Sequence, residues 1–172
     1  MAAGRKKLDW VGVVFLAVVT ALGGGTLRDL LLNRTAFWVV DSNYLWMIFG
    51  ASFITIAYVK FFKPPMNALL YADALGLSLF TILGAQVAEA EGASSLIVVV
   101  MAVLTGVAGG VIRDILTNEI PLLFRPSEPL YSIAALGGSL VYIVLQGFGV
   151  ETKIAALLGM LLVALLRFMA IK

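Results

Sequence analysis

Two arginine–aspartate pairs, each following a glycine cluster in an apolar run, are the residues of this sequence best suited to chemistry. Residues 17–33 read AVVTALGGGTLRDLLLN, and residues 102–118 read AVLTGVAGGVIRDILTN. Six residues recur 85 positions later: Thr20, Gly24, Gly25, Arg28, Asp29 and Asn33 return as Thr105, Gly109, Gly110, Arg113, Asp114 and Asn118. We call each copy a motif. A glycine cluster that weakens a helix, followed by an Arg–Asp pair at membrane depth, occurs here twice. Such a duplicated pattern is typical of a pore or carrier built from two related halves.

The glycines of the two motifs mark natural break points in a helix. Glycine costs a helix about 1 kcal/mol relative to alanine, so Gly23, Gly24 and Gly25 together subtract on the order of 3 kcal/mol, and Gly109 and Gly110 about 2 kcal/mol. If the helix bends or unwinds there, backbone carbonyls leave the hydrogen-bond ladder and can ligate a cation or water. Such backbone is tolerated at membrane depth only beside protein or a wet cavity. We therefore expect a hydrated passage at these hinges.

The charged residues of the motifs need partners in the protein interior. An unpaired charge near mid-bilayer costs about 2.5–3.5 kcal/mol on insertion scales. Neighbouring residues point to different sides of a helix, so we expect that Arg28 cannot simply neutralise Asp29. Partners must then come from other helices, from Asp73, or from water in a cavity. The two motif helices, with Arg113 and Asp114 on the second, are thus expected to face each other and to form a charged interior network or gate.

Some of these residues have a second, purely structural interpretation. Small residues such as Gly106 and Gly110 let helices approach closely, and a buried ionic network can serve only to lock a bundle. Thr20 and Thr105 can line a polar path, but threonine hydroxyls equally often bond back to their own helix. Asp73 lies near the end of its apolar run, where solvation at the interface is as reasonable as a partner for arginine.

The rest of the sequence supplies the helices that must position the motifs. Of the 172 residues, 62% are hydrophobic and 13% charged, and the mean hydropathy is +1.05. Charged and proline-rich interruptions divide the chain into spans of about 20 residues, the length that crosses a hydrocarbon core of about 30 Å. No alternation typical of a β-barrel is present. We predict an all-α, polytopic transmembrane bundle with six spans at 9–32, 43–62, 66–88, 94–117, 129–148 and 152–170.

The residue types also narrow the chemistry. The sequence has no cysteine and no histidine, so no disulfide, metal site or cofactor is expected. It offers no nucleophile–base pair, and its basic residues follow one membrane face instead of forming a nucleic-acid patch. We therefore expect that the protein is not an enzyme.

The basic residues predict an orientation in the membrane. Alternating the spans places most lysines and arginines on one face, which the positive-inside rule makes cytoplasmic. That face holds Arg5, Lys6, Lys7, Lys60, Lys63, Arg125, Arg167 and Lys172. Both termini then lie on the cytoplasmic side of the plasma (inner) membrane, and the acidic residues Glu89, Glu91 and Glu151 lie on the opposite side.

An odd number of spans separates the two motif helices, so the repeats are expected to be inverted. We predict a single transmembrane domain over 1–172, with an incomplete first repeat at 1–62, a second repeat at 66–148 and a final helix at 152–170. The span that carries Asp73 opens the second repeat. Its partner falls before residue 1 when 85 is subtracted, so the first repeat is expected to lack its opening helix here.

The motifs and their surroundings resemble a known family. GGGTLRD and AGGVIRD on successive repeats, with AAGRKKLDWVGV, TALGGGTLRDLLL, YLW and DALGLSLFTILGAQ, are similar to the prokaryotic trimeric intracellular cation (TRIC) channels, whose bacterial members are also labelled glycine-transporter-like membrane proteins. The resemblance implies seven helices, inverted three-helix repeats, a homotrimer, and a pore in each protomer for potassium and other monovalent cations. It also implies that the motif helices line the pore and kink at their glycines. A secondary carrier for glycine or a similar small zwitterion is the alternative, with the same Arg and Asp binding the carboxylate and the ammonium.

Overall fold

Six long helices form a bundle in the computed structural model, which describes residues 9–62, 65, 67–126 and 130–171. All regular secondary structure in those residues is helical, which confirms the predicted all-α fold. No end of a long helix lies more than two residues from its expected position. In chain order the elements are α2 (Trp10–Leu31), the short α3 (Phe37–Val40), α4 (Asn43–Phe61), α5 (Ala68–Ala90), α6 (Ser95–Leu116), the 3-10 helix η1 (Leu122–Phe124), α7 (Tyr131–Gly147) and α8 (Thr152–Ala170).

The lengths of these helices suit a bilayer. Five of them, with 19 to 23 residues, are long and apolar enough to cross a membrane. The sixth expected span is α7, an apolar helix of 17 residues. At about 1.5 Å per residue this helix reaches about 26 Å, near the lower limit for a spanning helix.

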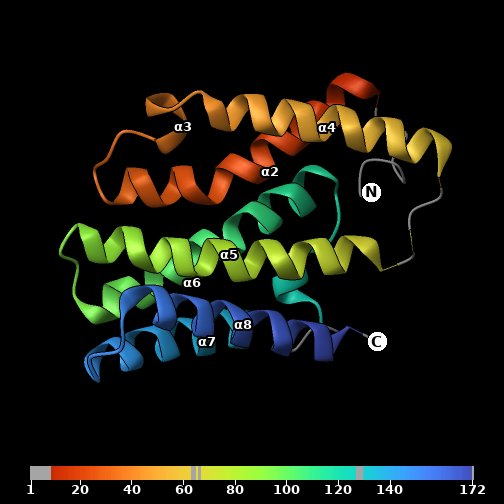
Figure 1. The fold of residues 1–172 in the computed structure, drawn as a ribbon. Coiled ribbons are helices and arrows are strands. Elements are labelled where there is room, and N and C mark those ends of the chain that lie inside the picture. Colours follow the sequence, from red (N-terminus) through yellow and green to blue (C-terminus); the bar gives the residue numbers. More distant parts are fainter. Residues whose placement is uncertain (1–8, 63–64, 66, 127–129, 172) are drawn as a thin grey trace.

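The helices lie in three pairs, as Figure 1 shows: α2 with α4 on one side, α5 with α6 in the middle, and α7 with α8 on the other side. The α5 helix packs on α6 and α8, whereas the main partner of α4 is α2. Ser52 is the one buried residue of α4. Most of this apolar helix therefore faces outward, as expected for a helix in contact with lipid.

The motif helices α2 and α6 cross at their glycines with two-fold related contacts. A Cβ added to Gly24 would overlap the carbonyl oxygen of Thr105, and one added to Gly109 would lie 2.5 Å from the carbonyl oxygen of Thr20. Each contact is the other shifted by 85 residues, and residue numbers rise along one helix as they fall along the other. The helices are therefore antiparallel, as the predicted inverted repeat requires. Such close approach suits small residues and Cα–H···O contacts.

The tightest packing lies on the side of the bundle formed by α5, α6, α7 and α8. Two clusters of buried apolar side chains join these helices, one around Ile82 and Tyr142 and one around Leu77 and Val163. Gly138 and Gly159 bring α7 and α8 together, because a Cβ on either would lie within 3.0 Å of the other's carbonyl oxygen. This half of the molecule gives α6 a firm support.

Some residues of the predicted cytoplasmic face can be placed and others cannot. Arg5, Lys6, Lys7, Lys63 and Lys172 lie outside the described residues. Arg167, grouped with that face, is fully buried in the last turn of α8, with its guanidinium 4.8 Å from the centre of the Tyr131 ring. The aromatic face and the helix C-terminus both favour a buried cation at this end of α8.

Candidate functional site: a cavity beside two arginine–aspartate pairs

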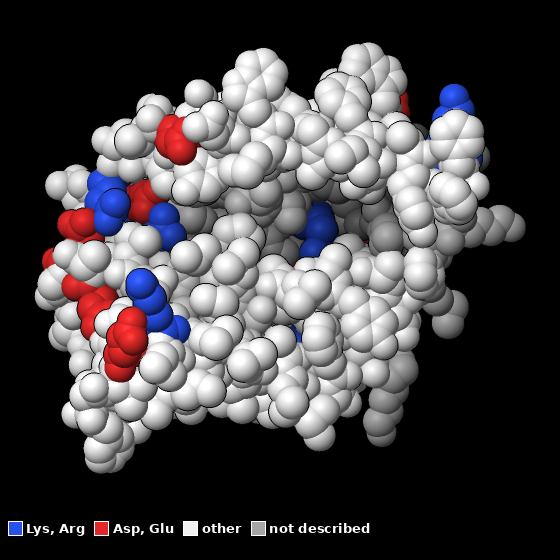
Figure 2. Space-filling model, viewed as in Figure 1, with Lys and Arg blue, Asp and Glu red and all other residues white. Residues whose placement is uncertain are grey.

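A cavity of about 520 Å³ lies between α2, α4, α5 and α6. Figure 2 shows the molecular face hollowed at this place, with basic atoms at the bottom of the hollow; Arg113 is the one Lys or Arg among the described residues that line the cavity. Most of the lining is apolar or small. Its polar and glycine members are Thr20, Gly24, Gly25, Ser52, Thr55, Asp73, Gly76, Thr105, Gly106, Gly109, Gly110 and Arg113.

The repeat relation shows how α2 and α6 contribute differently to the cavity. Ala17 and Ala21 of α2 line the cavity. Their equivalents 85 residues later are Ala102, which is fully buried, and Gly106, where an added Cβ would strike Thr81 of α5. In the second repeat, α5 packs on these positions through the cluster around Ile82 and through Thr81, although Gly106 still contributes to the cavity lining.

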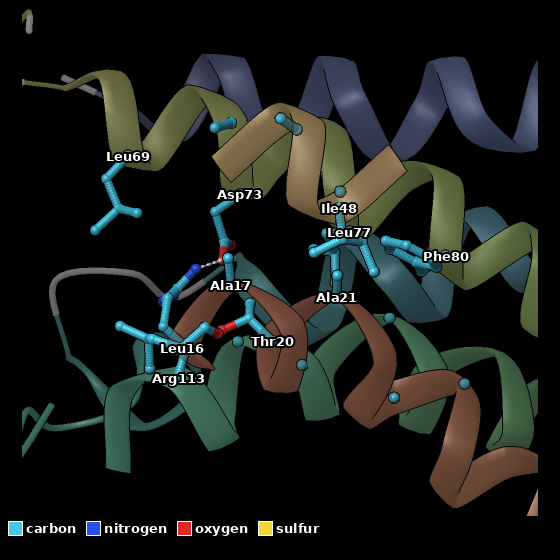
Figure 3. A pocket seen from close by; sticks show the side chains of 18 of the residues that line it. Leu16, Ala17, Thr20, Ala21, Ile48, Leu69, Asp73, Leu77, Phe80 and Arg113 are labelled. Atoms are coloured by element: carbon cyan, nitrogen blue, oxygen red, sulfur yellow. Dashed lines mark hydrogen bonds and ion pairs between the residues drawn. The ribbon is translucent and has the colours of Figure 1, made fainter. Parts of the chain in front are cut away.

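A buried ion-pair triad contributes two of its three residues, Asp73 and Arg113, to the cavity wall. Arg113 Nη1 donates to Asp73 Oδ1 at 2.7 Å, and its Nε donates to Asp114 Oδ1 at 2.8 Å. Figure 3 shows Asp73 on α5 and Arg113 on α6 pointing at each other across the cavity wall. All three residues are less than 10% exposed. Of the two interpretations of Asp73, the partner role is thus confirmed.

Gly110 makes room for this triad. A Cβ there would lie 2.9 Å from the Tyr131 hydroxyl and 3.2 Å from Asp73 Oδ1. Asp73 Oδ2 and Arg113 Nη2 are buried and have no hydrogen-bond partner among the described residues. The triad therefore retains one acceptor and one donor atom beside the cavity.

The first motif pairs within its own helix. Arg28 Nε and Nη2 both donate to Asp29 Oδ1, at 2.9 and 2.7 Å. The expectation that Arg28 cannot neutralise Asp29 was wrong, and the second motif repeats this contact between Arg113 and Asp114. Adjacent Cβ atoms do diverge on a helix, but the long arginine stem lets the guanidinium turn back to the neighbouring carboxylate.

The two arginine–aspartate pairs do not form one network. Arg28 lies in the last turn of α2 and Arg113 in the last turn of α6. Because α2 and α6 are antiparallel, the pairs lie toward opposite ends of the bundle, on either side of the glycine crossing. In the described part of the chain no ion pair joins them. The expected single network is therefore corrected to two separate clusters.

Each aspartate also holds the loop that follows its helix. Asp29 Oδ2 accepts the backbone N–H of Phe37 at 2.8 Å, and Asp114 Oδ2 accepts that of Leu122 at 3.0 Å. These bonds fix the starts of α3 and η1, two elements that the sequence analysis did not predict. Extending the 85-residue offset from Phe37 to Leu122 is the sequence signal that relates them.

The repeated asparagines belong to the same turns. Asn33 and Asn118 have φ of 55° and 52°, the left-handed region that ends many helices. The next N–H in each case bonds back to the carbonyl of the aspartate, at 2.7 Å from Arg34 and 2.8 Å from Glu119. The repeated asparagine of each motif therefore ends its helix.

The helices remain unbroken through the glycines. Both α2 and α6 are α-helical along their whole length, so of the two possibilities, bending or unwinding, unwinding is not observed at the glycines. Packing between helices stabilises what propensity alone disfavours. The Thr20 and Thr105 hydroxyls donate to the carbonyls of Leu16 and Met101, each at 2.6 Å. Both threonines nevertheless line the cavity, and their oxygen lone pairs can still accept.

Comparison with known proteins identifies relatives over nearly all of the chain. A family model described as glycine transporter matches residues 1–60 and 70–147. A UPF0126 membrane protein of Vibrio cholerae is 39% identical over 176 residues, which cover 100% of this chain and 72% of the relative. The UPF0126 inner membrane protein YadS of Escherichia coli is 38% identical over 177 residues, 100% of this chain and 84% of the relative.

Solved structures show the same fold. A TRIC trimeric intracellular cation channel orthologue from Rhodobacter sphaeroides has a TM-score of 0.92 and 37% identity, covering 98% of this chain and 86% of that chain. A prokaryotic TRIC channel solved in 0.5 M KCl has a TM-score of 0.88 and 32% identity, covering 98% and 85%. The chain therefore belongs to the family described as glycine transporter, with the UPF0126 membrane proteins, and shares the fold of the TRIC cation channels.

Proposed function

We propose that this protein is a membrane channel for monovalent cations, with potassium as the permeant ion, and that ions pass through the cavity beside Asp73 and the α2–α6 crossing. One observation carries the proposal: a cavity of about 520 Å³ reaches a buried carboxylate inside an apolar bundle. Charged groups within a membrane bundle mark ion or substrate pathways. The similarity in fold to cation channels supports the same reading.

The balance of charge at the triad favours cations over anions. An unpaired arginine on the path would repel a permeant cation. Here Asp73 and Asp114 both contact Arg113, at 2.7 and 2.8 Å, so two carboxylates oppose one guanidinium. The free Oδ2 of Asp73 adds an oxygen of the kind that binds a hard cation.

The assembly and placement follow as part of the proposal. The Rhodobacter orthologue is described as trimeric, and we propose a homotrimer with one path in each protomer. We place the protein in the inner membrane, where the name of the Escherichia coli relative places that protein, with both termini cytoplasmic according to the positive-inside rule. We also propose that the glycines of the two motifs border the path as hinges: Gly23, Gly24, Gly25, Gly109 and Gly110.

A carrier for a small zwitterion is the second candidate. The family description names a glycine transporter. The unpartnered Arg113 Nη2 and Asp73 Oδ2 are a donor and an acceptor suited to a carboxylate and an ammonium. Under this proposal the repeats would rock about the bound molecule.

Reconstitution in liposomes tests both candidates. Stepwise single-channel currents in KCl are expected for the channel, whereas saturable glycine uptake without unitary currents would establish the carrier. Arg113→Ala is expected to change conductance or gating in the first case and to abolish uptake in the second. The matched control is Arg34→Ala, which removes an exposed ion pair with Glu91 in the loops and is expected to leave either activity intact.

A further inference from the structure

We infer that a cation entering the cavity loosens the loop containing η1 through a relay of four residues, while the equivalent loop containing α3 does not respond. The relay runs from Asp73 through Arg113 and Asp114 to Leu122. The inference rests on the proposed function in one respect, since it requires cations to enter the cavity.

Hydrogen bonds connect every step of the relay. Asp73 Oδ1 accepts from Arg113 Nη1 at 2.7 Å, and Arg113 Nε donates to Asp114 Oδ1 at 2.8 Å. Asp114 Oδ2 accepts the N–H of Leu122 at 3.0 Å. Leu122 is 4% exposed and packs in the cluster that contains Leu77. A movement of Arg113 is thus transmitted to a buried anchor of the loop.

The first repeat has the same clamp without the connection to the cavity. Asp29 joins Arg28 and the N–H of Phe37 in the same way. In the described residues, however, no carboxylate from another helix contacts Arg28, whose other neighbour is the Phe37 ring, 5.8 Å away. The two arginine–aspartate–loop arrangements are therefore alike in geometry, but only the second is connected to a carboxylate that lines the cavity.

A cation changes the relay by competing for Asp73. Asp73 lines the cavity, and its buried Oδ2 atom has no hydrogen-bond partner among the described residues, so a cation that reaches this part of the cavity wall competes for the carboxylate. The cation weakens the charge-assisted bond between Asp73 and Arg113, the strong class of hydrogen bond. Arg113 is then held by one carboxylate in place of two. Without its bond to Asp73, the guanidinium can move, and Asp114 moves with it.

The absence of native cysteine allows a direct test with a matched pair of labels. Phe124→Cys reports on the η1 loop and Val39→Cys on the α3 loop; these positions are 85 residues apart and their native side chains are 65% and 58% exposed. Each variant, in nanodiscs that expose both membrane faces, is treated with a water-soluble maleimide. Reaction rates are compared in KCl and in N-methyl-D-glucamine chloride at equal ionic strength.

We expect KCl to raise the rate at Phe124→Cys by about threefold or more, the size of a modest local opening equilibrium, and to leave Val39→Cys unchanged. Adding Asp73→Asn should make the Phe124→Cys rate high in both salts and independent of potassium. Asp73→Glu, which keeps the carboxylate, should retain the potassium response with a shifted KCl midpoint. This variant tests the role of Asp73 if the Asn variant does not fold.

Three results would overturn the inference: the same response at both labels, no potassium response at Phe124→Cys, or a response that persists unchanged in Asp73→Asn. Potassium flux into liposomes, measured on the native sequence, separates this inference from the proposed function. Flux without a label response contradicts the relay alone. A label response without flux supports the relay and contradicts the channel.

Discussion

At the scale of the residue, the second glycine of each motif makes room for a different group. A Cβ on Gly25 would meet the Phe37 ring at 2.5 Å, whereas one on Gly110 would meet the Tyr131 hydroxyl and Asp73. The positions are equivalent in sequence, yet one seats an aromatic ring from a loop and the other an ionic cluster. Both copies of the motif therefore leave room beside the second glycine, and a different group occupies that room in each repeat.

The crossing glycines give the first prediction. Gly24→Ala should destabilise the protein by about 1–3 kcal/mol, the usual effect of overpacking, because the new methyl group meets the carbonyl of Thr105, which is helix backbone. Gly50→Ala on α4 is the control, since nothing lies within 4 Å of its added Cβ; it should stabilise by about 0.5–1 kcal/mol. Thermal unfolding midpoints in detergent measure both. Equal midpoints for the two variants would contradict the tight crossing.

The arginines give the second prediction. Removing one partner of a buried ion pair costs about 3–5 kcal/mol, and Arg113→Gln strands two carboxylates whereas Arg28→Gln strands one. We expect the lower unfolding midpoint for Arg113→Gln. Adding Asp73→Asn to Arg113→Gln should restore part of the loss, because one stranded charge is removed. A larger loss from Arg28→Gln would show that the two clusters are misassigned.

At the scale of the element, the long helices were predictable and the short ones were not. Hydropathy falls sharply at Lys63-Pro64-Pro65 and at Asn118, so the ends of α4 and α6 follow from composition. The elements α3 and η1 have 4 and 3 residues, too few for any periodic pattern. They exist because an aspartate on the preceding helix holds their first N–H, a contact over eight residues that neither propensity nor hydropathy encodes.

The ends of the motif helices give the third prediction. Asn118 has φ of 52°, a conformation that costs an L-residue with a Cβ about 1–2 kcal/mol. Asn118→Ala should therefore lower stability by about 1 kcal/mol, and Asn118→Gly should be neutral or slightly stabilising. Unfolding midpoints of the two variants provide the measurement. The same order is expected at Asn33; the reverse order at either position would contradict the left-handed turn.

At the scale of the whole molecule, the duplication predicted the inverted arrangement but not the division of the charges. Helix direction follows from counting spans, so the antiparallel crossing of α2 and α6 could be foreseen. Whether Arg28 and Arg113 meet depends on how far each lies from the crossing, which only packing decides. The difference between the repeats also comes from packing, because α5 brings Asp73 to Arg113 and packs on Ala102 and Gly106, the α6 equivalents of Ala17 and Ala21.

The orientation of the whole bundle gives the last prediction. The positive-inside rule places the η1 loop, with Arg125, in the cytoplasm and the turn after α7 outside. Phe124→Cys and Phe148→Cys replace side chains that are 65% and 83% exposed at these opposite ends. In right-side-out membrane vesicles, a membrane-impermeant maleimide should label Phe148→Cys at once and Phe124→Cys only after permeabilisation. The opposite pattern would invert the topology, and immediate labelling of both positions would mean that the chain inserts in two orientations despite the excess of basic residues on one face.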